Sequence, residues 1–216
     1  MKLWMKGIIA VALALALLAA AGLAEIADWA MEQTTVSAQD ARVANQEAAL
    51  GAPVNAAVKA SDITRKCSVR VSTGDKDRML DGKVTRGWKY EGAEAWAEIG
   101  MPSGVNPGAI RIEWLYDPTG FELVEYGADK AELRRRTQAD TFPNIYTMFA
   151  LLPETRSVRL NMTAPDQVVV NLAVYSEGVL PNSVQTWLPP VQKADMMVFS
   201  THQDDEIIFL GGTIPY

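Results

Sequence analysis

The stretch Ala109-Ile110-Arg111-Ile112-Glu113-Trp114-Leu115 places apolar and charged side chains at largely alternating positions. Successive side chains of an extended strand point to opposite faces, so this alternation gathers apolar side chains on one face. Similar runs occur in Cys67–Val71, Trp96–Glu98, Phe121–Glu125, Ser157–Thr163 and Gln167–Tyr175. Short strands of this kind predict an all-β sandwich, in which two sheets bury their apolar faces against each other.

Turn-forming residues separate the expected strands. They cluster at Asp81-Gly82, Pro102-Ser103-Gly104, Asn106-Pro107-Gly108 and Asp117-Pro118-Thr119-Gly120. Glycine, proline, asparagine and aspartate favour tight turns, each for its own backbone reason. About 120 residues are enough to form one two-sheet core. We therefore assign residues 61–186 to a single β-sandwich.

Three segments of this region share a recognisable pattern. Met79–Trp88 contains an Asp-Gly turn and ends on tryptophan, Ala95–Met101 reads as a tryptophan-containing strand, and Ala109–Ile112 repeats isoleucine. With Gly120–Leu123, these segments resemble the discoidin-like (galactose-binding-like) jelly-roll family over residues 61–176. The resemblance implies a jelly-roll-like sandwich that binds a carbohydrate or a cell surface through loops at one end. In many members, a structural calcium lies near the Asp-Gly loop.

Five residues are candidates for these roles. By the resemblance, Asp75, Asp77 and Asp81 could supply oxygen ligands to calcium, which takes several. The alternative is that these acids only stabilise turns. Trp88 and Tyr90 lie beside a loop and could stack on a sugar ring, whereas tryptophans inside the expected strands are assigned to the core.

The stretch 194–213 has a different character. The apolar run Met196–Phe199 is typical of a strand covered on both faces, and the acids that follow suit the first turn of a helix. An imidazole and a carboxylate three positions apart, His202 and Asp205, can bind one zinc ion. Asp204 between them could take a proton from a zinc-bound water. On spacing alone, the alternative is a polar turn whose acids cap a helix.

The segment Ser200-Thr201-His202-Gln203-Asp204-Asp205-Glu206, followed by Gly211-Gly212-Thr213, resembles the first motif of the PIG-L/LmbE-like zinc-dependent deacetylases. The resemblance covers residues 193–216 and implies the first strand, turn and helix of a Rossmann-like α/β domain. It makes the histidine and the second aspartate zinc ligands and the first aspartate the general base. The family takes its third ligand from a later histidine. Because this chain contains one histidine, we expect an incomplete zinc site and no activity from the chain itself.

Three functional hypotheses remain open. In the first, the chain is the N-terminal portion of an exported deacetylase that removes acetyl groups from N-acetylglucosamine-type sugars. In the second, it is a standalone carbohydrate- or cell-surface-binding module with a vestigial tail. In the third, it is a structural envelope protein without a ligand. The first two hypotheses share the same expected partner, an N-acetylated amino sugar or another glycan.

Residues 1–24 have the features of a targeting segment: two lysines, an apolar centre and small residues at the end. A cleaved signal peptide and an uncleaved membrane anchor both fit, because the apolar run is close to the minimum for spanning a bilayer. Either one places the rest of the protein outside the cytoplasm, secreted or in the cell envelope. Residues 25–60 are expected to form a helical or loosely ordered connector, and residues 187–216 a linker and the start of the deacetylase-like domain.

Composition excludes one class of partner. The net charge is −6, and an acidic protein without a basic face does not favour nucleic acid. Membrane contact is expected only through the N-terminal segment, if it is uncleaved. The one basic cluster, Arg134-Arg135-Arg136, is expected on a solvated loop or helix face. Cys67, the single cysteine, cannot form an internal disulfide and is expected to be a buried apolar residue.

Overall fold

The computed structural model describes residues 39–89, 95–140 and 145–186. The targeting segment expected at residues 1–24 and the deacetylase-like segment expected at residues 187–216 lie outside the described residues. Within the described ranges, none of the helices has the length and apolar character needed to cross a membrane. Most of the regular structure is β-sheet, as the alternating sequence predicts.

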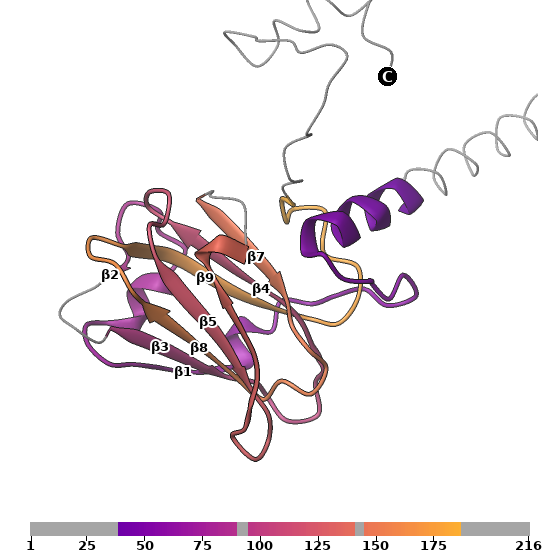
Figure 1. Cartoon of the computed structure of the whole chain (residues 1–216). Helices are drawn as coiled ribbons and strands as arrows, with labels where there is room; N and C mark the ends of the chain where they lie inside the picture. The colour runs from indigo at the N-terminus through magenta and orange to yellow at the C-terminus, as the bar shows by residue number, and fades with distance from the viewer. Residues whose placement is uncertain (1–38, 90–94, 141–144, 187–216) are drawn as a thin grey trace, which may run out of the picture.

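Two antiparallel sheets lie face to face (Figure 1). The first sheet contains, in spatial order, β1 (Ser68–Val71), β3 (Trp96–Gly100), β8 (Ser157–Met162), β5 (Phe121–Tyr126) and β6 (Glu132–Thr137). The second contains β2 (Trp88–Lys89), β9 (Val168–Ser176), β4 (Pro107–Trp114) and β7 (Tyr146–Ala150). Three short 3-10 helices accompany them: η1 (Thr64–Lys66), η2 (Lys76–Met79) and η3 (Gln138–Asp140). The described residues therefore form the predicted β-sandwich.

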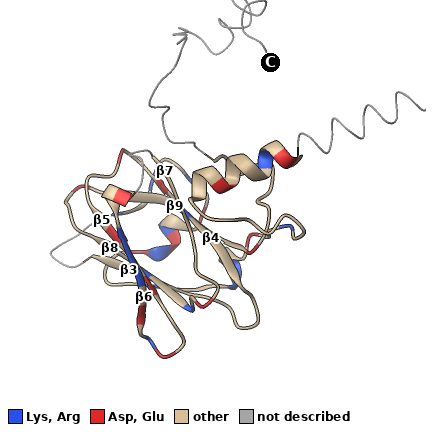
Figure 2. Ribbon diagram, turned by 45° about the vertical axis from the view of Figure 1, so that its right-hand side comes forward, with Lys and Arg blue, Asp and Glu red and all other residues tan. Residues whose placement is uncertain are grey.

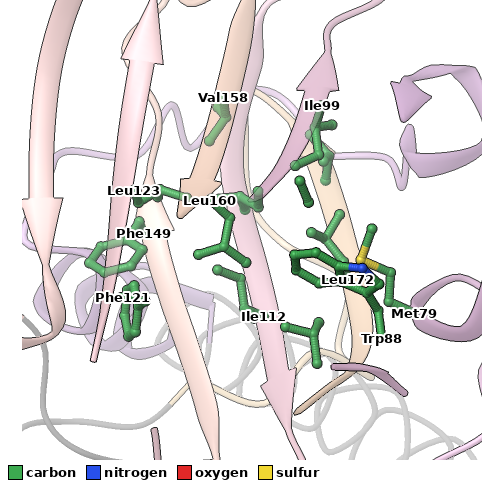
Figure 3. Packing of buried hydrophobic residues seen from close by; sticks show 14 of the residues in the cluster. Met79, Trp88, Ile99, Ile112, Phe121, Leu123, Phe149, Val158, Leu160 and Leu172 are labelled. Atoms are coloured by element: carbon green, nitrogen blue, oxygen red, sulfur yellow. The ribbon is translucent and has the colours of Figure 1, made fainter. Parts of the chain in front are cut away.

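The core lies between the sheets, where the alternation requires it. On β4, Ile110, Ile112 and Trp114 are at most 2% exposed. Leu123 and Leu160 approach them from the five-stranded sheet (Figure 3) and belong to the same buried cluster. Each such side chain contributes roughly 1.5–3 kcal/mol by leaving water, so this interior supplies the main driving force for the fold.

Aromatic side chains mark the two sides of this core. The ring centroids of Trp114 and Phe121 are 5.0 Å apart, and those of Phe121 and Phe149 are 6.1 Å apart in an edge-on arrangement. On the other side, Met79 of η2 lies beside Trp88 of β2 (Figure 3). Both of the latter side chains are at most 1% exposed. The short helix η2 therefore closes one side of the core.

The arginine cluster lies on β6 rather than on a loop or helix face. Glu125 of β5 is fully buried, and its carboxylate accepts hydrogen bonds of 2.7–2.9 Å from Arg134 Nε, Arg136 Nη2, the Leu152 N–H and the Thr155 hydroxyl. Arg135, by contrast, pairs with two more exposed acids, Glu122 and Glu132. Figure 2 shows the basic residues of this strand in blue. The expectation of a solvated cluster is therefore wrong for the two arginines that hold Glu125.

A helix over residues 39–50 is attached to the sandwich (Figure 1). It ends before Gly51-Ala52-Pro53, as expected from these helix-breaking residues, and Gly51 has a φ of +61°. Gln46 is 3% exposed. Its buried side chain accepts a hydrogen bond from the Leu180 N–H at 2.9 Å and donates one to the Gly178 carbonyl at 3.2 Å. From residue 39 onward, the connector expected to be helical or loosely ordered therefore contains a helix that is docked on the sandwich.

The segment that leads into the sandwich, near Lys59, and the segment that leaves it, near Val179, lie side by side. Lys59 and Val179 form a parallel bridge, in which the Ala60 N–H donates to the Val179 carbonyl at 2.9 Å and the Val179 N–H to the Val58 carbonyl at 2.7 Å. Gly178 has a φ of +119°, and a Cβ there would lie 2.4 Å from the Val58 oxygen. Only glycine fits at such a position, so this joint depends on its residue type.

Candidate ligand-binding site

Three loops meet at one end of the sandwich. They span residues 72–87, 115–120 and 163–167. Their shared location follows from strand register, because Val169 of β9 pairs with Trp88 of β2 on one side and with Trp114 of β4 on the other. Loops carried on a rigid sheet are the usual place for ligand contacts.

A cleft of about 250 Å³ opens at the first of these loops. It is lined by Gly74, Asp75, Arg78, Gly87, Trp88 and Lys89. The lining therefore combines one carboxylate, two cations and the edge of an indole. Its volume lies just below the usual range for ligand pockets, roughly 300–1,000 Å³, so it suits one sugar-sized ring better than an extended chain.

Trp88 lines this cleft and also belongs to the core. Its side chain is 1% exposed, and its indole N–H donates to the Thr73 carbonyl at 2.7 Å. A ring that stacks on a sugar must expose its face to solvent, and this ring is covered instead by core neighbours such as Met79. This burial argues against the predicted stacking of Trp88 on a ligand.

The three aspartates expected to bind calcium each have a local role. Asp75 caps η2 by accepting the Asp77 N–H at 3.0 Å, and Asp77 pairs with the neighbouring lysine. Asp81 accepts the Lys83 N–H at 2.9 Å and Arg86 Nε at 3.0 Å, and these bonds hold the pKa of Asp81 below its usual range. Among the described residues, no three His, Cys, Asp or Glu side chains are grouped to hold a metal ion. The hydrogen bonds accordingly favour the alternative, turn stabilisation.

Arg78 is the distinctive side chain of the cleft. It is exposed, and within the described ranges its guanidinium has no hydrogen-bond or ion-pair partner. The cations next to it in sequence are engaged, because Lys76 pairs with Asp77 at 2.6 Å and Arg86 with Asp81 at 2.5 Å. Arg78 therefore retains donors that a bound molecule could use.

An exposed aromatic ring follows in the second loop. Tyr116 is 70% exposed, and it comes directly after Leu115, whose N–H bonds to the Val168 carbonyl at 3.0 Å. Val168 pairs on its other side with Lys89 of the cleft. Leu115 and Lys89 thus flank the same residue, two strand spacings apart, or roughly 10 Å. No motif in the sequence singled out Tyr116 or Arg78.

Two larger clefts, of about 470 and 600 Å³, lie where the 39–50 helix meets the sandwich. Arg134 lines the smaller cleft and Arg42 the larger. Both arginines are already committed to the fold. Arg134 donates to Glu125 and to the Ala150 carbonyl, and Arg42 donates to the Leu180 carbonyl. The arginines of these two clefts are therefore less available to a ligand than Arg78 is.

The remaining predicted site residues cannot be placed. Tyr90, the second proposed sugar-stacking residue, lies outside the described ranges. So do the proposed zinc ligands His202 and Asp205 and the proposed base Asp204. The candidate site described above therefore brings together Asp75 and Trp88 of the predicted set, and it adds Arg78, Lys89 and Tyr116.

No protein-family model matches the chain, and no curated protein matches it. Among solved structures, it is similar to the lectin domain of Lectinolysin complexed with Lewis B antigen, with 17% identity, 54% of this chain and 97% of that chain covered, and a TM-score of 0.42. A Streptococcus pneumoniae fucose binding module has 14% identity to it, with 54% of this chain and 96% of that chain covered and a TM-score of 0.43. The family 32 carbohydrate-binding module of C. perfringens NanJ in complex with galactose has 9% identity, with 54% of this chain and 98% of that chain covered and a TM-score of 0.44. At this level of similarity, the ligands of those proteins do not transfer to this chain.

Proposed function

We propose that the sandwich is a carbohydrate-binding module whose ligand lies across the loop end, from the cleft at Arg78 to the ring of Tyr116. The observation that carries the proposal is this pairing of a cation without a partner among the described residues and an exposed aromatic ring at one end of a rigid sandwich. Sugars present hydroxyl groups, which charged side chains bind, and apolar C–H faces, which pack on aromatic rings.

The spacing of the two side chains sets the size of the ligand. Lys89 lines the cleft, and Leu115 directly precedes Tyr116. Strand β2, which carries Lys89, and strand β4, which ends at Trp114, are separated by one strand, β9. A single ring in the cleft of about 250 Å³ would therefore leave Tyr116 for a neighbouring unit. The arrangement favours an oligosaccharide over a free monosaccharide. The resemblance of residues 61–176 to discoidin-like modules supports the same class of ligand.

Replacing Tyr116 with alanine should weaken glycan binding without weakening the fold. Loss of one stacking contact should reduce affinity by roughly tenfold, since about 1.4 kcal/mol corresponds to a factor of ten. The thermal midpoint should not change, because the ring is 70% exposed. The measurement is a glycan array with the full chain, followed by calorimetric titration of the best ligands with both proteins.

Leu133→Ala is the matched control for this prediction. Leu133 is 39% exposed and lies on β6 near the β5–β6 turn, at the opposite end of the sandwich. The Leu133→Ala variant should bind the same glycans with the affinity of the parent protein. Equal affinities of the parent and Tyr116→Ala proteins would remove Tyr116 from the site, and an array without any bound glycan would contradict the proposed function itself.

A second proposed function is based on the motif within residues 193–216. Imidazole and carboxylate are donors that zinc accepts, so His202 and Asp205 fit the metal chemically. When bound, zinc polarises an amide oxygen and lowers the pKa of its water to about 7. Asp204 would hold the proton that this water gives up. This proposal makes the sandwich the glycan-binding part of an exported N-acetyl sugar deacetylase.

The 216-residue chain should not release acetate from a chitin oligosaccharide in the presence of zinc. Catalytic zinc sites use three protein ligands, and the motif of this chain supplies two, His202 and Asp205. Acetate is measured after prolonged incubation with and without zinc. Zinc-dependent turnover that disappears in the Asp204→Ala variant would contradict this expectation.

A further inference from the structure

The loop 115–120 carries Tyr116 between two backbone hydrogen bonds. At its start, the Leu115 N–H donates to the Val168 carbonyl at 3.0 Å. At its end, the Thr163 N–H donates to the Gly120 carbonyl at 3.1 Å. Tyr116 itself is 70% exposed, so packing against the core does not fix its ring. The direction in which the ring points therefore depends on what holds the middle of the loop.

Gln167 ties this loop to the neighbouring loop, 163–167. It directly precedes β9 and is 5% exposed. Its Oε1 accepts a hydrogen bond from the Gly120 N–H at 3.4 Å, and its Nε2 donates to the Gly120 carbonyl and, at 3.1 Å, to the Ala164 carbonyl. A carboxamide offers two donors and an acceptor, so one buried side chain bonds to the backbone of both loops.

Gln138 reaches the same loop from the other sheet. It belongs to η3, which follows β6, and its Nε2 donates to the Pro118 carbonyl at 2.6 Å. Pro118 is buried and lies two residues after Tyr116. The bonds of Gln138 and Gln167 to this loop span 20 and 47 positions of the chain. Both side chains therefore fasten the loop to distant parts of the sandwich, and neither bonds to the backbone of a strand.

We infer that Gln138 and Gln167 are positioning residues, which hold Tyr116 in its ligand-binding position before a ligand arrives. The inference rests on the proposed function and concerns how its aromatic contact is prepared. A loop that becomes ordered only on binding loses conformational freedom at that moment, and this loss weakens affinity. The two glutamines restrict that freedom in advance. Neither of them lines the loop-end cleft, so their effect on a ligand passes through the loop.

A double-mutant cycle with Tyr116 tests the inference. Gln138→Ala should weaken binding of the best array glycan to the full chain by roughly threefold to tenfold, as expected when a loop must be ordered by the ligand. In a Tyr116→Ala background, the same substitution should change affinity by less than about twofold, because the ring that it positions is absent. Backbone amides of the loop should also exchange hydrogen faster in Gln138→Ala than in the parent protein.

Two further variants frame this measurement. Gln167→Ala should show the same dependence on Tyr116 and also a lower thermal midpoint, because Gln167 is 5% exposed; Gln138 is half-buried, and its replacement should spare the fold. Arg156→Ala is the matched control. Arg156 donates to the Pro153 carbonyl at 2.9 Å in the loop that follows β7, at the opposite end of the sandwich. Its loss should leave glycan affinity unchanged.

The outcomes separate the inference from the proposed function. If Gln138→Ala weakened binding equally with and without the Tyr116 ring, the glutamine would not act through that ring, and the inference would be wrong. Loop amides that exchange no faster in Gln138→Ala would also overturn it. Unchanged affinity in Gln138→Ala, beside weaker binding in Tyr116→Ala, would overturn the inference and leave the proposed function intact. An array without any bound glycan would contradict both.

Discussion

Replacing Glu125 with alanine is expected to destabilise the fold by about 3–5 kcal/mol, because it leaves a largely buried arginine, Arg136, and a partly exposed one, Arg134, without their counter-charge. Arg134 Nε and Arg136 Nη2 both donate to this carboxylate at 2.7 Å. The Arg136 side chain is 14% exposed, so water replaces the lost acceptor only in part. For a domain with a total stability of roughly 5–15 kcal/mol, this loss is large. Urea denaturation followed by tryptophan fluorescence measures it.

Glu122→Ala is the control for that comparison. Glu122 also pairs with an arginine of β6, Arg135, at 2.6 Å, but the two side chains are 32% and 44% exposed. Exposed ion pairs contribute about 0–1 kcal/mol. If Glu125→Ala cost no more than Glu122→Ala, the buried carboxylate would not be the anchor of β6.

The same carboxylate should make stability depend on acid pH. Burial alone would raise the pKa of Glu125, but hydrogen bonds from Arg134, the Leu152 N–H and Thr155, with the charge of Arg136, outweigh burial and hold the pKa below its ordinary value of 4.5. Burial lowers the pKa of Arg136 to about 10, so this partner stays charged in acid.

Since the folded-state pKa of Glu125 lies below the unfolded-state pKa, the ionised side chain stabilises the fold above the ordinary value of 4.5. This contribution disappears as pH falls through the lower folded-state pKa. Glu125→Gln should therefore lose less of its own stability than the parent protein between neutral and strongly acidic pH. Exposed acids such as Glu132 titrate alike in both proteins, so their contributions to the pH dependence of stability cancel in the comparison.

The sequence predicts the strands whose side chains alternate, and it misses the others for physical reasons. β4 and β9 are predicted because large apolar side chains, such as Ile110 and Ile112 or Leu172 and Val174, recur at alternate positions and belong to the buried core. β6 carries arginines at three successive positions, so neither face looks apolar. Its place in the sheet depends on Glu125 of a neighbouring strand, a contact that no local pattern reveals. β2 contains two residues, too few to show a period.

The candidate site was less predictable than the fold. A turn composed of polar residues indicates only that a loop is present, and the lining of the loop-end cleft comes from two separate segments, 74–78 and 87–89. Arg78 gains significance because the described residues around it leave it without an acid partner. Such a distinction between paired and unpaired charges requires three-dimensional contacts. The aspartates of the same loop looked like metal ligands for the converse reason, since their partners are not visible in the sequence.

Trp88→Ala should lower stability by about 3–5 kcal/mol, the range for removing a large aromatic side chain from a core. The ring is 1% exposed and belongs to the same cluster as Met79 and Leu172 (Figure 3). Its replacement would open a cavity between η2 and the second sheet. It would also leave the Thr73 carbonyl without the indole donor at 2.7 Å. Urea denaturation measures the loss, with Tyr116→Ala as an exposed aromatic control.

Trp88→Phe separates the packing role of this residue from a ligand-binding role. Phenylalanine keeps most of the apolar volume but has no N–H, so the part-buried Thr73 carbonyl loses its partner at a cost of about 1–3 kcal/mol. A core residue should show this loss in stability while glycan affinity at low temperature is retained. A ligand-stacking residue would show the reverse, an unchanged denaturation midpoint with weakened binding. That reverse result would restore the sugar-stacking role suggested by its position beside a loop.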